Sequence, residues 1–111
     1  MNHRQGARTP VNIETLVDDT RPPLRITDVS LGGLFVRGTV HDLSIGSPLV
    51  LWFRLDRPNG AETYRWRGVV VRVATGGVGA LFESADPLDQ RGLLALMTAA
   101  DEDRQRRASR R

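Results

Sequence analysis

The sequence predicts a mainly β fold, a six-stranded antiparallel β-barrel followed by one C-terminal α-helix. Three observations lead to this prediction. Hydrophobic and polar residues alternate over much of the first 82 residues, which is the period of strands with one buried face. Short clusters of Gly, Pro, Asn and Asp separate these stretches. After Phe82 the apolar spacing changes to that of a helix.

Six segments are expected to form the strands, because they alternate in polarity or are rich in β-branched and aromatic residues. In chain order they are VNIETLV (11–17), PPLRIT (22–27), GLFVRG (33–38), PLVLWFRL (48–55), TYRWRGVVVRV (63–73) and VGALF (78–82). The Asn59-Gly60 pair between the fourth and fifth segments suits a tight hairpin. Since no helix separates the strands, we expect an antiparallel meander that closes into a small barrel and so leaves no exposed edge.

The segment after Phe82 predicts one helix. Asp86 suits the N-cap, Pro87 the first helical position, and Asp89 the first turn, where its charge complements the helix dipole. Apolar residues then follow at helical spacing and give a surface broad enough to close one opening of the barrel. They are Leu88, Leu93, Ala95, Leu96, Met97 and Ala99.

Length and composition indicate one soluble globular domain. The chain has 111 residues, 40% hydrophobic and 26% charged, which suffices for a single core but not for two. We expect a flexible N-terminal arm at 1–10, the barrel and its helix at 11–103, and an arginine-rich tail at 104–111. The N-terminal segment has no apolar core of the signal-peptide kind, and the longest apolar run, PLVLWF, is too short to span a bilayer. A cytoplasmic location without membrane insertion is therefore expected.

The basic character of the chain is concentrated at its C-terminal end. Five of its 16 arginines lie in residues 104–111 (RQRRASRR), so residues 1–103 hold 11 arginines against 13 acidic residues. This tail could attract nucleic acid, or it could be a solvated end that keeps the protein soluble. The second interpretation is favoured because no basic stripe continues into the body and the preceding DED sequence opposes one. Nucleic acid is therefore not an expected partner.

The sequence offers no set of catalytic or metal-binding residues. His3 and His41 are its two histidines, it has no cysteine, and no acidic residues have the spacing of a metal site. Ser30 lacks the preceding glycine of a nucleophile elbow. The GGVGALF segment at 76–82 lacks the Lys-Ser/Thr pair of a phosphate-binding loop and is expected to be a hairpin turn. We therefore expect no enzyme activity, no cofactor and no metal.

Two short motifs remain to be explained. HRQGAR at 3–8 places Arg4 and Arg8 four residues apart, and Gly6 and Pro10 make a helix there unfavourable. DVSLGG at 28–33 combines an acid, a hydroxyl and two glycines between apolar segments. Taken alone, the second motif is typical of a turn, and an RxxxR pattern in an arginine-rich chain is a weak signal.

Together the two motifs resemble the signature of the PilZ domain family, RxxxR followed by DxSxxG. All five signature positions are filled, by Arg4, Arg8, Asp28, Ser30 and Gly33. PilZ domains are small six-stranded β-barrels with a C-terminal helix, so the resemblance implies the same architecture as the polarity pattern. It further implies a bacterial receptor for the second messenger cyclic di-GMP, bound by these five residues, with His3 and Gly32 as candidate additional contacts.

The residue types suit such a ligand, which presents two phosphates and two guanines. Arginine can donate two parallel hydrogen bonds to a phosphate or to the O6 and N7 edge of guanine, and can stack on the base. Asp28 can accept from guanine N1–H and the exocyclic amine, and Ser30 lies on the same strand face. Gly33 allows the backbone to approach the ligand closely.

The resemblance leaves several points open. The family often has a second arginine directly before RxxxR, where this chain has His3, so one or two ligand molecules could bind. Some PilZ proteins bind no ligand and act as scaffolds in pilus assembly, although these usually lack the motifs. We expect residues 1–9 to order over the ligand and so to create a surface for a downstream protein partner, because Met1 is their one sizeable apolar group.

Overall fold

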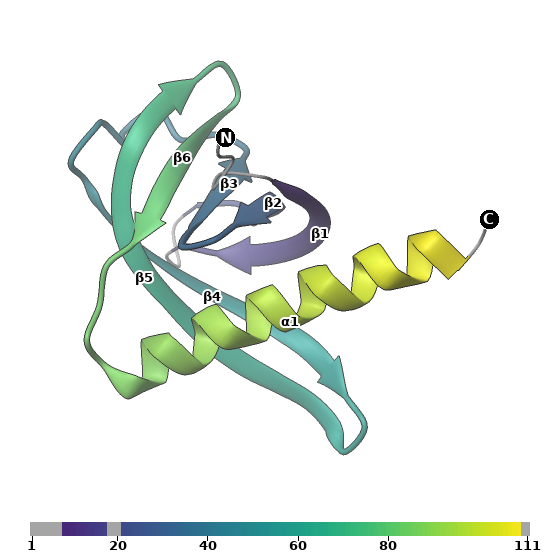
Figure 1. Ribbon diagram of the computed structural model, residues 1–111. Coiled ribbons are helices and arrows are strands. Elements are labelled where there is room, and N and C mark those ends of the chain that lie inside the picture. Colours follow the sequence, from purple (N-terminus) through teal and green to yellow (C-terminus); the bar gives the residue numbers. More distant parts are fainter. Residues whose placement is uncertain (1–7, 18–20, 110–111) are drawn as a thin grey trace, which may run out of the picture.

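The computed structural model describes residues 8–17 and 21–109, which form six strands and one helix (Figure 1). The strands are β1 (Thr9–Leu16), β2 (Leu24–Ser30), β3 (Gly33–Arg37), β4 (Pro48–Arg57), β5 (Gly60–Ala74) and β6 (Gly77–Phe82), and the helix is α1 (Pro87–Ser109). The strands close into an antiparallel barrel. The predicted fold class is therefore confirmed.

The order of the strands differs from the meander that we expected. Around the barrel it is β1-β2-β3-β6-β5-β4, so β3 pairs with β6, and β4 returns to β1. The segment 38–47 connects β3 to β4 and is long enough to carry the chain past the intervening strands, whereas the β2–β3, β4–β5 and β5–β6 hairpins have two-residue turns. The seam between β1 and β4 is short, with Thr15 opposite Phe53 and Leu16 opposite Trp52.

The core fills the interior of the barrel with large side chains that alternate along the strands. Trp66 is 1% exposed and packs edge-on against Phe82, with ring centroids 5.8 Å apart. The other fully buried side chains of the strands come from almost every part of the barrel. They include Leu24, Ile26, Val36, Leu49, Leu51, Val70 and Val78.

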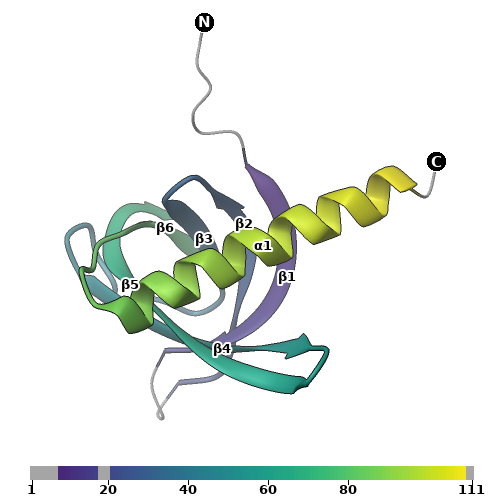
Figure 2. The same ribbon diagram turned by 60° about the horizontal axis from the view of Figure 1, so that its bottom comes forward.

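The helix runs across one end of the barrel, as Figure 2 shows, and packs chiefly on β5 and β1. Gly92 is the point of closest approach, since a Cβ atom there would lie 1.9 Å from the carbonyl oxygen of Arg65. Ala95, Leu96 and Ala100 complete the buried face. Leu88, which we placed on that face, is 44% exposed, because the face is centred one residue further along.

The start of the helix matches its prediction. The carboxylate of Asp86 accepts a hydrogen bond from the backbone N–H of Leu88 at 2.9 Å, as an N-cap does. The end of the helix differs from the expected boundary, because α1 runs on to Ser109 and includes residues 104–109 of the expected tail. Thr9 and Pro10 likewise belong to β1 and not to the arm.

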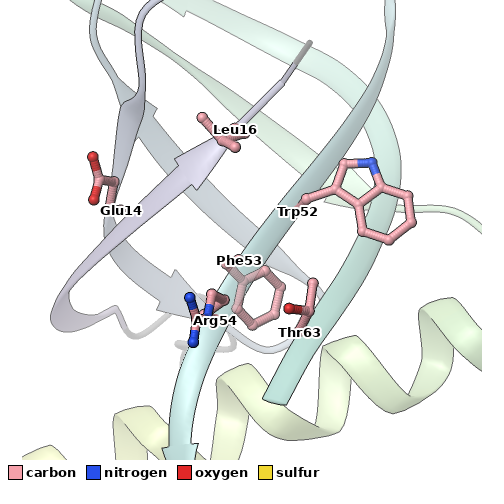
Figure 3. A pocket seen from close by; sticks show the side chains of 6 residues that line it. All are labelled: Glu14, Leu16, Trp52, Phe53, Arg54 and Thr63. Atoms are coloured by element: carbon pink, nitrogen blue, oxygen red, sulfur yellow. The ribbon is translucent and has the colours of Figure 1, made fainter. Parts of the chain in front are cut away.

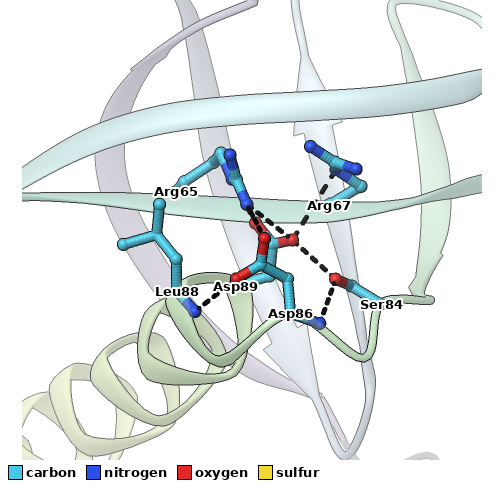
Figure 4. Close-up of polar contacts among 6 residues, drawn as sticks. All are labelled: Arg65, Arg67, Ser84, Asp86, Leu88 and Asp89. Atoms are coloured by element: carbon cyan, nitrogen blue, oxygen red, sulfur yellow. Dashed lines mark hydrogen bonds and ion pairs between the residues drawn. The ribbon is translucent and has the colours of Figure 1, made fainter.

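The first turn of the helix is fixed to the barrel by a buried carboxylate. Asp89 is fully buried and accepts hydrogen bonds from Arg65 at 2.5 Å and from Ser84 at 2.6 Å (Figure 4). Arg67 adds an ion pair at 3.6 Å. The hydrogen bond from Arg65, with smaller contributions from Ser84 and Arg67, holds the pKa of Asp89 below its usual value, although burial acts in the opposite direction. Its role is therefore larger than the helix-dipole contact that the sequence predicted.

Within the residues that the structure describes, α1 is not apolar enough to cross a membrane, and no other helix is present there.

Candidate functional site

The DVSLGG motif forms the end of β2, the turn into β3 and the start of β3. Ser30 pairs with Gly33 across this hairpin, which leaves Leu31 and Gly32 as the two turn residues. Gly32 has a φ of 80°, a conformation that a residue with a side chain adopts with strain. Leu31 is 74% exposed at the tip. The motif is thus a turn, and it also places an acid and a hydroxyl beside one another.

Gly33 lets this turn pack closely against β6. A Cβ atom at this position would lie 3.1 Å from the carbonyl oxygen of Ala80 and 3.1 Å from the side chain of Leu81. At the end of β6, the backbone N–H of Phe82 donates a hydrogen bond to the carbonyl oxygen of Gly32 at 2.6 Å. The glycine therefore fixes the turn on the barrel, a reason for it that the sequence alone did not reveal.

Arg8 and Asp28, far apart in sequence, are brought together by the pairing of β1 and β2. Pro10 lies opposite Asp28 in this pair, so the residue that leads into β1 passes the end of β2. Nη1 of Arg8 donates a hydrogen bond to Oδ1 of Asp28 at 2.9 Å. The side chains are 49% and 23% exposed respectively, so both can be reached from solvent. Ser30 is on the same face of β2 as Asp28, because buried Val29 separates them.

Four of the five expected signature residues lie close together in the structure, and the fifth lies outside the described residues. Arg8, Asp28, Ser30 and Gly33 lie at one end of the barrel around the β2–β3 hairpin. Gly32, a candidate additional contact, belongs to the same turn. Arg4 and His3 lie outside the described residues.

A hollow of about 290 Å³ opens beside this hairpin. Thr9, Ser30 and Leu31 form one side of it. The opposite side is formed by the last turns of α1, which the sequence gave no reason to connect with the motif. The helix residues are Met97, Ala100, Asp101 and Arg104.

A second hollow, of about 420 Å³, lies at the seam between β1 and β4 and is more apolar (Figure 3). Leu16 and Trp52 line it and are 49% and 42% exposed. The guanidinium carbon of Arg65 lies 5.8 Å from the centre of the Trp52 ring, within the range of a cation–π contact. Arg54 and Glu14 are the charged residues of its lining, and Leu16, Trp52 and Phe53 give it a wider apolar wall than the hollow beside Ser30 has.

Among residues 8–17 and 21–109 no group of histidine, cysteine and acidic side chains is arranged to hold a metal ion. His41, in the connection between β3 and β4, is exposed. The chemical groups gathered at the β2–β3 hairpin are thus a guanidinium, a carboxylate, a hydroxyl and backbone amides. Groups of these kinds can form hydrogen bonds with phosphates and with the edges of bases.

Comparison with known proteins relates this chain to a sequence family and to solved structures. The sequence model of the family described as "PilZ domain" matches residues 2–99. The solved structure of the Bacillus subtilis inhibitor of motility (MotI/DgrA) resembles this chain with a TM-score of 0.66 at 18% sequence identity. The similarity covers 100% of this chain and 54% of that one, so this chain spans about half the length of that protein. Among curated proteins, none matches the sequence.

Proposed function

This chain belongs to the PilZ domain family, and from that premise we propose that it is a receptor that binds cyclic di-GMP at the β2–β3 hairpin. The observation that carries the proposal is the ion pair between Arg8 and Asp28, 2.9 Å long, which joins the two family motifs at one place. The hollow beside Ser30 provides room next to that pair. Arg4 would complete the site from the N-terminal side.

The roles of the groups follow from their donors and acceptors. A guanidinium has five N–H donors, and the bond to Asp28 occupies one of them, so Arg8 can keep that bond while it donates to a phosphate or to guanine O6 and N7. Asp28 can accept from guanine N1–H and the amino group, which adenine does not offer in that arrangement. Ser30 can donate its hydroxyl hydrogen to a phosphate.

We propose further that the N-terminal arm relays the signal. Arg8 stands directly before β1, so a ligand held by Arg8 and Arg4 would fix the arm relative to the barrel. The ordered arm and the ligand would then present a joint surface to a downstream protein. Ordering such a segment costs about 2 to 5 kcal/mol of the gross interaction energy, which favours the moderate affinity of a reversible sensor.

The test is calorimetric titration of the protein with cyclic di-GMP, cyclic di-AMP and linear GMP. We expect measurable binding of cyclic di-GMP and much weaker binding of the other two, because adenine lacks the O6 acceptor and GMP has half of the groups. Equal affinity for the two cyclic dinucleotides would contradict the roles given to Arg8 and Asp28. Absence of cyclic di-GMP binding would overturn the proposed function and leave the non-binding scaffold as the alternative.

The nucleic-acid alternative, based on the arginine-rich end, gains no support from the described part of that segment. Arg104 is ion-paired with Asp101, and Arg106 and Arg107 are both ion-paired with Asp103. Their charges are therefore partly neutralised on the helix itself. Binding to DNA or RNA that is tight at low salt and is lost when residues 104–111 are removed would revive this alternative.

A further inference from the structure

The last turns of α1 present two different sets of side chains to the barrel. Residues 97, 100, 101 and 104, with the spacing of one helical face, line the hollow beside Ser30. Residues 99, 102, 103 and 106 line another hollow, of about 340 Å³, together with parts of β1 and β4. Arg104 and Arg106, two residues apart, therefore lie on opposite sides of the helix. Arg104 is on the side that faces the β2–β3 turn.

The C-terminal end of the helix is hydrogen-bonded to the beginning of β1. Nη2 of Arg107 donates a hydrogen bond to the carbonyl oxygen of Pro10 at 3.1 Å. Pro10 lies opposite Asp28 in the β1–β2 pair. Arg107 is also ion-paired with Asp103, which fixes its orientation on the helix. Arg104, one turn earlier, is thus kept at the edge of the same site.

The charges around the hairpin cancel in pairs. Arg8 is paired with Asp28, and Arg104 is paired with Asp101. A ligand with two phosphates brings two negative charges, so a cation that can exchange its partner would add a contact to those expected from Arg8. Arg104 is suited to this, because its ion pair is exposed, with 64% of its side chain and 48% of that of Asp101 open to solvent. Exposed pairs of this kind are weak and are readily exchanged.

We propose that Arg104 is a further ligand-contacting residue, which leaves Asp101 and binds a phosphate of the cyclic dinucleotide in the hollow between α1 and the β2–β3 turn. This inference rests on the proposed function. The ligand is then held between two walls of this hollow, with Ser30 on the strand side and Arg104 on the helix side. Asp28 lies beyond the lining, two residues from Ser30 on the same face of β2. Arg104, the first residue of the expected arginine-rich tail, is therefore part of the site. Asp101 competes with the ligand for this arginine.

The experiment compares Arg104→Ala with Arg106→Ala in titrations with cyclic di-GMP. The two arginines are matched, since each is 64% exposed and each is paired with an aspartate three residues earlier. Both variants lose the same charge from the same helix. We expect Arg104→Ala to weaken binding by about tenfold, because it removes a charge-assisted hydrogen bond to a phosphate. We expect Arg106→Ala to leave the affinity nearly unchanged.

Three outcomes would overturn the inference. If the two variants bind with equal affinity while the wild type binds well, Arg104 does not contact the ligand and the proposed function stands. If Arg104→Ala and the similarly sized Arg104→Gln both melt far below Arg106→Ala, the arginine is structural. If the wild type does not bind cyclic di-GMP, the proposed function fails and this inference fails with it.

A second variant tests the competition directly. Asp101→Asn removes the carboxylate that holds Arg104, and we expect it to tighten cyclic di-GMP binding by a few fold. In the Arg104→Ala background the same substitution should have a smaller effect, because no competition for that arginine remains. An equal gain in both backgrounds would mean that Asp101 acts only through its long-range charge, and the exchange would be disproved.

Discussion

Arg8 and Asp28 are joined by an ion pair between Nη1 and Oδ1 of 2.9 Å. The pair links the residue that precedes β1 to the end of β2, where the DxSxxG motif begins. The two motifs of the family are therefore connected directly by this ion pair.

Arg8→Ala and Asp28→Ala should each weaken cyclic di-GMP binding by at least about tenfold, because each removes a set of hydrogen bonds to a guanine or a phosphate. The melting temperature should change little, since an exposed ion pair contributes about 0 to 1 kcal/mol. Calorimetry gives the affinity and differential scanning fluorimetry gives the melting temperature.

Arg25→Ala is the matched control for these two variants. Arg25 also makes a hydrogen bond across the β1–β2 pair, to the side chain of Asn12 at 2.9 Å, and is exposed. Its removal should affect neither ligand binding nor stability strongly. Loss of binding in Arg25→Ala as well would indicate that the β1–β2 pair, and not the individual guanidinium of Arg8, determines affinity.

Deletion of residues 2–7 should abolish or strongly weaken cyclic di-GMP binding and leave the melting temperature nearly unchanged. The deletion removes Arg4 but keeps Arg8 and all of β1. Hydrogen exchange of the full chain should show protection of this segment only when the ligand is present. Full affinity of the deletion variant, or protection already present without ligand, would disprove the relay by the arm.

Gly92→Ala should destabilise the protein by about 1 to 3 kcal/mol or more, because the new methyl group would meet the backbone of Arg65 and push the helix away from β5. Urea denaturation followed by circular dichroism measures the loss. Gly79→Ala is the control, since the nearest atom to its Cβ would lie at an ordinary 3.6 Å. Equal stability of the two variants would mean that the helix tolerates a larger separation from the barrel.

Asp89→Asn should lower stability at neutral pH by about 1.5 to 3 kcal/mol, since it removes the charge from hydrogen bonds with Arg65 and Ser84. The pKa of Asp89 is lowered in the folded protein. Its contribution is therefore complete above the unfolded-state pKa of about 4 and is lost as the pH falls through the folded-state pKa. Denaturation curves of wild type and variant should differ at pH 7 and converge in acid.

Asp103→Asn provides the control for that pH dependence. Asp103 is also ion-paired with arginines, but its side chain is 31% exposed and it lies at the solvated end of the helix. Its replacement should cost little at any pH. A difference between wild type and Asp89→Asn that persists unchanged in acid would show that the effect comes from packing and not from the charge.

The sequence predicted the strands well because their polarity largely alternates, as in β4, where Leu49, Leu51 and Phe53 are buried. It did not predict the strand order. Turn residues report only on local hairpins. The pairing of β3 with β6 depends on the 38–47 connection and on Gly77 of β6, where a Cβ atom would lie 2.3 Å from the carbonyl oxygen of Val36. A local hairpin, in contrast, was predicted within one residue: the Asn59-Gly60 pair was expected at the turn, and the turn residues between β4 and β5 are Pro58 and Asn59.

The site was predicted in part. The spacing of Asp28 and Ser30 placed them correctly on one face of a strand, because that follows from a period of two. The closeness of Arg8 to Asp28 came only from the resemblance to a family, since local patterns hold no information on strand pairing. Arg104 was assigned to a solvated tail, because a run of like charges gives no sign of which turn of a helix will pass the barrel.

The strand order also divides the barrel into two continuous halves of the chain. β1, β2 and β3 form one three-stranded unit of sequential hairpins, and β4, β5 and β6 form the other. The segment 38–47 is the covalent link between them, and the pairs β3–β6 and β1–β4 close the barrel. Contacts between strands that are close in sequence form faster than contacts between distant strands. Each half can therefore form its own hairpins before β3 pairs with β6 and β1 pairs with β4. Cutting the chain within 38–47 should accordingly yield two fragments that reassemble by complementation. The first fragment would carry both signature motifs and the second the helix, so the complete nucleotide site would exist only in the reassembled pair.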